Sequence, residues 1–170
     1  MAAAATVIGA IGTASIVGSA GKTLLIQGVT GATRGIVSGV GYLLTVSSKK
    51  QGVAELHQLM DDLDILSKLR VIEAFIGRLS GCQLDKASTL ALSNVKECLE
   101  QINGEISNVN EQIKQADQMG FVSKWWYGSP DLSKYLTSIK SLDRRFHQRL
   151  SLLIQMLPPG YQTHDELNLS

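Results

Sequence analysis

The sequence predicts an all-α protein: an antiparallel bundle of three to four long helices, preceded by a glycine-rich apolar helical hairpin. The first observation behind this prediction is that residues 1–48 hold nine of the 16 glycines and none of the 15 acidic residues. The second is that large apolar side chains recur every three or four positions from residue 53 onward. The third is that this later region contains no run of alternating polar and apolar residues, the pattern of a half-buried strand.

Composition divides the 170 residues into three parts. Residues 1–48 form a Gly/Ala-rich apolar segment for membrane or assembly contact, residues 51–157 form the helical bundle, and residues 158–170 form a polar tail. The 16 basic and 15 acidic residues nearly cancel, so no clustered basic excess points to nucleic acid as a partner. Two cysteines, Cys82 and Cys98, are too few for a disulfide scaffold and favour a reduced compartment.

The front segment is read as two helices, residues 3–20 and 23–46, that turn at Gly21 and Lys22. Residues 2–21 carry no charge, and a helix of that length reaches about 30 Å, the thickness of the hydrocarbon layer of a bilayer. Small residues three or four positions apart let helix backbones approach closely, as in a glycine zipper. The candidate packing glycines are Gly9, Gly12, Gly28, Gly31, Gly35 and Gly39.

Two surroundings for this hairpin stay open at this stage, a membrane and a protein assembly that buries it. Arg34 is the main objection to the membrane, because a charge at its centre costs a few kcal/mol unless it is paired or reaches the interface. A cleaved signal peptide is disfavoured, because no basic residues precede the apolar stretch. A loop of an α/β fold is the third alternative.

Two glycine motifs raise the question of nucleotide binding. Residues 18–23 (GSAGKT) resemble the end of a P-loop, but the motif requires glycine where this chain has Ile16. Residues 30–36 (TGATRGI) resemble the cofactor turn of short-chain dehydrogenases, but that family has glycine where Val37 stands. We therefore expect no nucleotide cofactor.

The bundle is predicted from three apolar stripes. The first covers residues 53–79 and ends at Ser80 and Gly81, a helix stop. The last helix begins with Ser129 as N-cap and Pro130 at the first helical position, and it stops at the prolines after residue 157. Between them lies the strongest periodic signal, three heptads of an a/d seam. Its members are Leu92, Val95, Leu99, Ile102, Ile106, Val109 and Ile113.

Three short features are candidate binding sites. The aromatic residues Trp125, Trp126 and Tyr127 are either a plug at the end of the bundle or an anchor at a membrane interface. A basic cluster on the last helix is either a solvated face or a phospholipid headgroup site. It consists of Arg144, Arg145, His147 and Arg149.

The third feature is the start of the tail. Pro158, Pro159 and Tyr161 match the PPxY signal of WW-domain ligands, and the same prolines also serve as a helix stop. A WW-domain protein is therefore a candidate partner.

No catalytic, cofactor or metal site is expected, and we predict that the protein is not an enzyme. His57, His147 and His164 lie in separate segments with no cysteine or aspartate at a recognisable spacing. Asp61, Asp62 and Asp64 are read as solvated charges on one helix, where the first two point apart.

Two resemblances to known families add to this reading. Residues 92–156, with 95–106 (VKECLEQINGEI) and 149–155 (RLSLLIQ), are similar to the HeLo-type four-helix bundles of the mixed lineage kinase domain-like family. That resemblance implies membrane association and permeabilisation. Residues 64–65, 68–69, 124–126 (KWW) and 142–145 (LDRR) resemble helical proteins of large DNA viruses that have a membrane inside an icosahedral capsid.

Three functions follow as hypotheses. The first is a structural protein whose front helices pack in or on a membrane while the bundle binds a protein partner or a second copy, as in a virion that links membrane to capsid. The second is a HeLo-like module for membrane permeabilisation or cell-death signalling. The third is a soluble helical adaptor. The first two imply a membrane-associated protein, facing the cytosol or within a virion.

Overall fold

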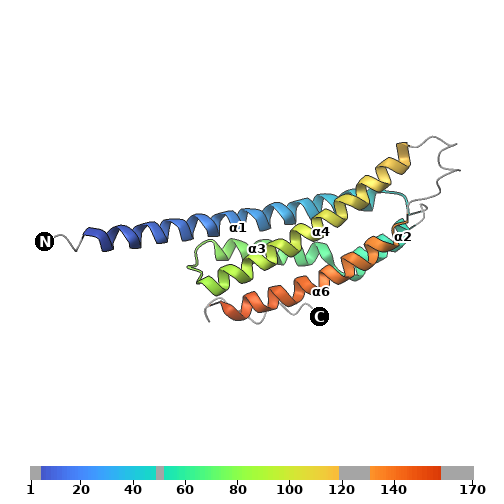
Figure 1. The fold of residues 1–170 in the computed structure, drawn as a ribbon. Coiled ribbons are helices and arrows are strands. Elements are labelled where there is room, and N and C mark those ends of the chain that lie inside the picture. The colour runs from blue at the N-terminus through green and yellow to red at the C-terminus, as the bar shows by residue number, and fades with distance from the viewer. Residues whose placement is uncertain (1–4, 49–51, 119–130, 158–170) are drawn as a thin grey trace.

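The computed structural model describes residues 5–48, 52–118 and 131–157, with side chains from residue 20 onward. Within these ranges the chain forms five α-helices and no strand, which confirms the predicted all-α class (Figure 1). The helices are α1 (Ala5–Thr45), α2 (Val53–Asp62), α3 (Ile65–Leu79), α4 (Lys86–Gln118) and α6 (Ser133–Met156).

The helices pack side by side, with α4 between α1 and α6 (Figure 1). α6 runs antiparallel to α4, because Ser138 near its start bonds Glu105, whereas the carbonyl of Met156 at its end accepts from Ser88. α1 runs parallel to α4. Gly28 of α1 lies against Lys96 of α4, and Gly35, seven residues later in α1, lies against Asn103, seven residues later in α4. α3 runs back along α1 in the opposite direction (Figure 1).

The core is apolar and receives side chains from all five helices. All seven residues of the predicted heptad seam lie in it, with Leu92, Val95, Ile106 and Val109 fully buried. The buried face of α4 is wider than this seam, since it also includes Ala91, Cys98 and Asn110, and a wide apolar face requires more than one neighbouring helix. In this fold α1 and α6 together cover that face of α4.

The predicted hairpin at the front is wrong, because α1 continues without a turn through Gly21 and Lys22. An interior glycine lowers helix stability by only about 1 kcal/mol relative to alanine, which tertiary contacts can offset. The ammonium of Lys22 makes such contacts by donating to the carbonyl oxygens of Ser80 and Cys82, both at 2.8 Å. Lys22 thus covers the free carbonyls at the end of α3 and holds α1 straight beside it.

The single helix predicted for residues 53–79 is also wrong, because the chain breaks into α2 and α3 at Leu63 and Asp64. Asp64 has a φ of 44°, in the left-handed region that aspartate tolerates better than most residues. The apolar spacing of three and four continues across the break, so periodicity could not reveal it. Asp64 therefore lies outside the helix that holds Asp61 and Asp62.

The start of α6 differs in detail from the prediction, since the helix begins at Ser133. Ser129, Pro130 and the predicted stop at Pro158 lie outside the described residues. Asp131 supports the first turn, because its Oδ1 accepts hydrogen bonds from the backbone N–H and the hydroxyl of Ser133, at 2.9 and 2.6 Å. These bonds lower the pKa of the Asp131 carboxyl below its usual value.

Candidate functional site

Three of the predicted packing glycines lie against α4 of the same chain. A Cβ atom on Gly28 would collide with the stem of Lys96, and one on Gly35 would lie 2.5 Å from Asn103 Oδ1. A Cβ on Gly39 would lie 2.5 Å from the Cγ2 atom of the buried Ile106. The close approach that glycine spacing predicts therefore occurs inside the bundle, between α1 and α4.

The other packing glycines do not join this contact. Gly31 is exposed, and no heavy atom lies within 4 Å of the position its Cβ would take. Gly9 and Gly12 lie in the part of α1 whose side-chain surroundings are not described. Arg34, the objection to a membrane-embedded segment, is exposed on α1.

Asn110 adds a polar contact to the same interface. Its side chain is 8% exposed, and its Nδ2 donates to the carbonyl oxygen of Gly39 at 3.1 Å. Its Oδ1 is buried and finds no partner among the described residues. The Nδ2 bond ties α1 to α4, whereas the unbonded Oδ1 atom lowers stability, because a buried polar atom is costly unless it is bonded.

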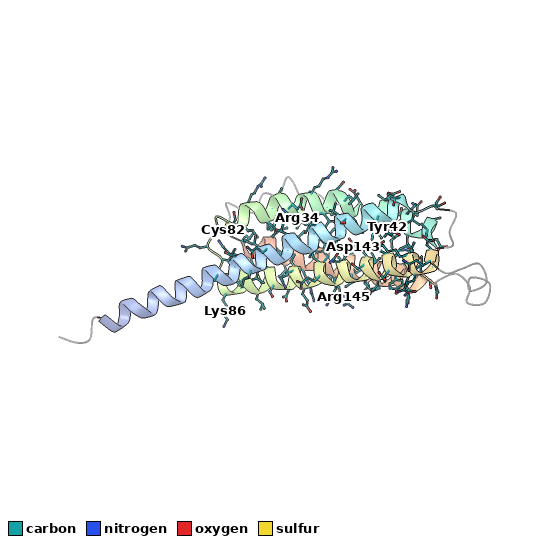
Figure 2. The ribbon with its side chains drawn as sticks, turned by 90° about the horizontal axis from the view of Figure 1, so that it is seen from above. Arg34, Tyr42, Cys82, Lys86, Asp143 and Arg145 are labelled. Atoms are coloured by element: carbon teal, nitrogen blue, oxygen red, sulfur yellow. The ribbon has the colours of Figure 1, made fainter. Side chains whose placement is uncertain are left out.

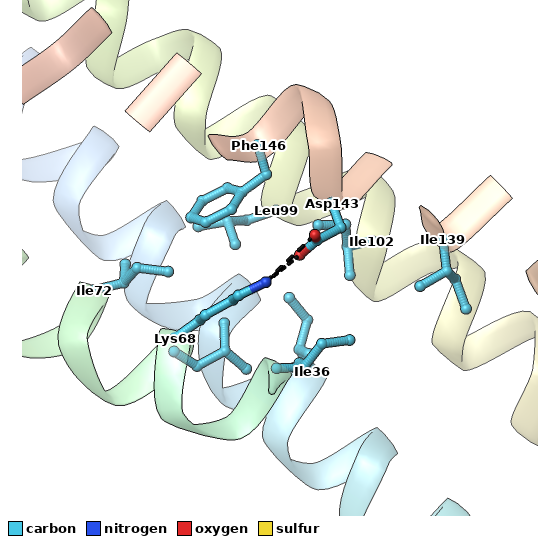
Figure 3. Close-up of a pocket in the computed structure, with 10 residues that line it drawn as sticks. Ile36, Lys68, Ile72, Leu99, Ile102, Ile139, Asp143 and Phe146 are labelled. Carbon is cyan, nitrogen blue, oxygen red and sulfur yellow. Dashed lines mark hydrogen bonds and ion pairs between the residues drawn. The ribbon is translucent and has the colours of Figure 1, made fainter. Parts of the chain in front are cut away.

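A small cavity lies where α1, α3, α4 and α6 meet (Figure 3). Its volume is about 20 Å³, enough for roughly one water molecule and too small for a substrate. Apolar side chains make up most of its wall, and Lys68 and Asp143 stand at its edge. The apolar lining consists of Ile36, Ile65, Leu69, Ile72, Leu99, Ile102, Ile139 and Phe146.

Lys68 of α3 and Asp143 of α6 form an ion pair across this cavity (Figure 3). The Lys68 Nζ atom lies 3.3 Å from Asp143 Oδ1, and the two side chains are 15% and 14% exposed. His147 Nε2 lies 3.5 Å from Asp143 Oδ2. Burial and the positive charge of Lys68 lower the pKa of His147, while Asp143 opposes the shift. His147 is therefore neutral at pH 7. Lys68, Asp143 and His147 together form a polar link between α3 and α6.

His57 and the two cysteines are also engaged in packing, whereas His164 lies outside the described residues. His57 Nε2 donates to the carbonyl oxygen of Leu43 at 2.8 Å and so ties α2 to α1. Both cysteines are free and buried. Burial raises the pKa of the Cys98 thiol, which makes it less reactive. Among the described residues no three His, Cys, Asp or Glu side chains gather as a metal site.

Exposed apolar side chains gather at one end of the bundle, where α4 begins and α6 ends. We call this the apolar end and define it by four residues. Ser88 Oγ of α4 donates to the carbonyl oxygen of Met156 of α6 at 3.1 Å, which joins the two helices there. The four residues and their exposed fractions are Leu24 (66%), Leu90 (63%), Leu152 (44%) and Met156 (40%).

The first part of α1 extends past the apolar end (Figure 1). Gly28 faces Lys96 and Gly35 faces Asn103, an offset of 68 residues in both pairs. The same offset places the start of α4 level with residue 18 of α1. Residues 5–17, which we call the arm, therefore continue the helix beyond the bundle for about 20 Å. The arm contains no charged residue.

Several predicted features fall outside the described residues. They include the aromatic residues Trp125, Trp126 and Tyr127, and the PPxY residues Pro158, Pro159 and Tyr161. In the described part of the chain, no helix combines the length and the apolar character needed to cross a membrane.

Sequence reasoning missed the Lys68–Asp143 pair, which joins residues 75 positions apart. One signal was present: Asp143 is the single acidic residue among the 24 of α6, and it falls next to the apolar stripe. An isolated charge in such a place is a candidate for a buried partner.

Comparisons with known proteins give no relative, since no protein-family model, curated protein or solved structure matches this chain.

Proposed function

We propose that this protein is a non-enzymatic structural protein whose bundle holds an uncharged helical arm for packing in or on a membrane, while the bundle binds a protein partner or a second copy. The observation that carries the proposal is that residues 5–17 extend past the apolar end, beside Leu24, Leu90, Leu152 and Met156. A component that links a membrane to a virion capsid is one protein of this kind. The proposed setting is a reduced compartment facing the cytosol, or a virion.

The composition of the arm favours contact with lipid or with another protein over exposure to water. An isolated helix of about 13 residues is marginal in water, and each interior glycine costs about 1 kcal/mol more than alanine. The arm contains Gly9 and Gly12 and no charged side chain to solvate it. Contact with lipid or with a neighbouring protein would supply the stabilisation that water does not.

The packing of α1 inside the bundle limits which part of α1 can contact lipid or a neighbouring protein. Because Gly28, Gly35 and Gly39 are occupied by α4, they are not free for a membrane or a partner helix. Gly9 and Gly12 of the arm, and the exposed Gly31, are the remaining candidates for a glycine zipper with another molecule.

Flotation of the full chain with liposomes tests the proposal. We expect the protein to float, and the double variant Ile8→Glu with Ile11→Glu to stay at the bottom, because two carboxylates in the arm must be desolvated to enter lipid. The matched control is Val37→Glu with Leu44→Glu, which alters two exposed apolar residues of α1 outside the arm and should float. A full chain that stays at the bottom, or arm variants that float normally, would contradict the proposal.

A second candidate is a soluble helical adaptor, and the packing of three glycines inside the bundle favours it. In that case neither the full chain nor the variants would float, and a WW-domain protein is a candidate partner for residues 158–161. The HeLo-like alternative predicts dye release from liposomes. The structural proposal predicts flotation without release.

A further inference from the structure

We propose that the outer seam between α4 and α6 at the apolar end is a lipid-binding surface that selects anionic headgroups. Leu90, Leu152 and Met156 would enter the boundary between headgroups and acyl chains, while Lys86 and Arg145 contact the phosphates. This inference rests on the proposed membrane function and deepens it by naming the surface of the bundle and the class of lipid.

The side chains of α6 that form the surface share one stripe of the helix. Arg145, Leu152 and Met156 are separated by seven and four residues, so they lie one above another. Their position beside α4 is given by the neighbouring Arg149, whose Nη1 donates to the carbonyl oxygen of Asn94 at 2.8 Å. Arg145, Leu152 and Met156 are all exposed.

The matching stripe of α4 contributes Lys86 and Leu90. Leu90 precedes Glu97 by seven residues, and Glu97 Oε2 lies 3.3 Å from Arg149 Nη1 of α6. Leu90 and Lys86 are therefore on the side of α4 that meets α6. Figure 2 shows Lys86 and Arg145 along the same edge of the molecule. Apolar groups flanked by cationic side chains are typical of a surface that lies on a membrane.

The charges favour an anionic partner. α6 carries five Lys and Arg residues, and its single acid, Asp143, is bound by Lys68. On α4, Glu97 is paired with Arg149 and Glu100 with Lys96. Besides Lys134, whose ammonium lies over the ring of Tyr135, three exposed cations of α6 have no ion pair among the described residues. They are Lys140, Arg144 and Arg145.

The one acidic residue near the start of α4 is also engaged. Asp85 Oδ1 accepts a hydrogen bond from the backbone N–H of Ser88 at 2.7 Å and so caps the helix. The basic residues of the seam therefore face outward with little competition from carboxylates. The same end carries the arm, so a membrane touching the arm would also meet this surface.

Co-sedimentation of the full chain with two kinds of vesicle tests the inference. One vesicle contains phosphatidylcholine alone, and the other contains phosphatidylcholine with phosphatidylglycerol. We expect stronger binding to the second, and Arg145→Gln should lower its partition coefficient about fivefold, the effect of one cation near an anionic surface. Arg70→Gln, which removes an exposed charge from α3, is the matched control and should bind as the full chain does.

A second pair of variants tests the apolar side chains of the proposed lipid-binding surface. Leu90→Gln should weaken binding to both vesicles, whereas Val37→Gln, at another exposed apolar site, should not. Equal binding to both vesicles, or equal losses for Arg145→Gln and Arg70→Gln, would overturn the lipid selectivity while the arm proposal stands. Failure of the full chain to bind either vesicle would overturn both.

Discussion

The ammonium of Lys68 lies 3.3 Å from the carboxylate of Asp143 and joins α3 to α6 over an apolar cavity. α6 packs mainly on α4, and α3 packs mainly on α1, so this ion pair joins two helices that otherwise make few contacts with each other. A pair so placed is satisfied only when both partners are present.

Removing one partner of this pair should therefore destabilise the protein more than removing both. We expect Asp143→Leu to lower the free energy of unfolding by about 2 kcal/mol, because it leaves a largely buried ammonium without its partner. Lys68→Met with Asp143→Leu should recover most of that loss. Urea unfolding of the three proteins measures both values, and a double variant less stable than Asp143→Leu would contradict the explanation.

Acid should weaken the same region through His147. Burial, and then the charge of Lys68, lower the pKa of His147 in the folded protein, while Asp143 opposes them. The unfolded chain therefore binds a proton more readily than the folded one. The contribution of neutral His147 is complete above its unfolded pKa of about 6.5 and declines as the pH falls below that value.

The check is the free energy of unfolding measured across this range for the full chain and for His147→Gln. We expect the slope with pH below about 6.5 to be smaller in the variant, since it has no imidazole to protonate. Identical slopes in the two proteins would assign the acid sensitivity to other groups.

The glycines of α1 should respond to alanine with opposite signs. Gly39→Ala places a methyl group against the buried Ile106 and should destabilise the bundle by about 1–3 kcal/mol. Gly31→Ala meets no atom within 4 Å and should stabilise it by up to about 1 kcal/mol, through the higher helix propensity of alanine. Denaturant unfolding of both variants decides the matter, and equal effects would mean that α1 does not lie on α4 as described.

The cap of α4 should contribute stability that acid removes. Hydrogen bonds from Ser88 lower the pKa of the Asp85 carboxyl, so the folded state favours the carboxylate. The contribution is present above the unfolded pKa of about 3.9 and is lost as the pH falls through the lower folded value.

Asp85→Ala should therefore lower the melting temperature at pH 7, with a difference that narrows in strong acid. Asp62→Ala changes an exposed aspartate in α2 and serves as the control. Thermal unfolding followed by circular dichroism is the measurement, and equal shifts for the two variants would count against a capping role.

Part of this fold could be predicted because it depends on local geometry alone. The heptad seam of α4 was identified from spacing, and every one of its members is buried. A regular apolar stripe has one way to be covered, which is to face other helices. The same reasoning indicated close packing at Gly28, Gly35 and Gly39 but could not name the partner helix, which comes 68 residues later.

The two errors in the helices arise where apolar spacing and glycine content do not decide the backbone conformation. At Gly21 the local preference is to end a helix, yet Lys22 is bound by carbonyls 58 and 60 residues away and the helix continues. At Asp64 the apolar period continues, yet the backbone takes a left-handed conformation and the helix ends. At Lys22 distant contacts outweigh a local preference of about 1 kcal/mol. At Asp64 the backbone bonds are local, from its own N–H to Asp61 and from the Lys68 N–H to its carbonyl oxygen.

The order of amino acids by itself determined that this chain is helical, that its first part avoids charge, and which stripe of each helix is apolar. These properties depend on residues that are close together in the sequence. Because an α-helix has 3.6 residues per turn, the spacing of apolar residues directly determines which face of the helix is apolar. Only the tertiary structure decided that α1 is one straight helix, that its glycines face α4, and that Lys68 meets Asp143. Such contacts join residues far apart in sequence, so they stabilise the protein only after the helices have packed side by side.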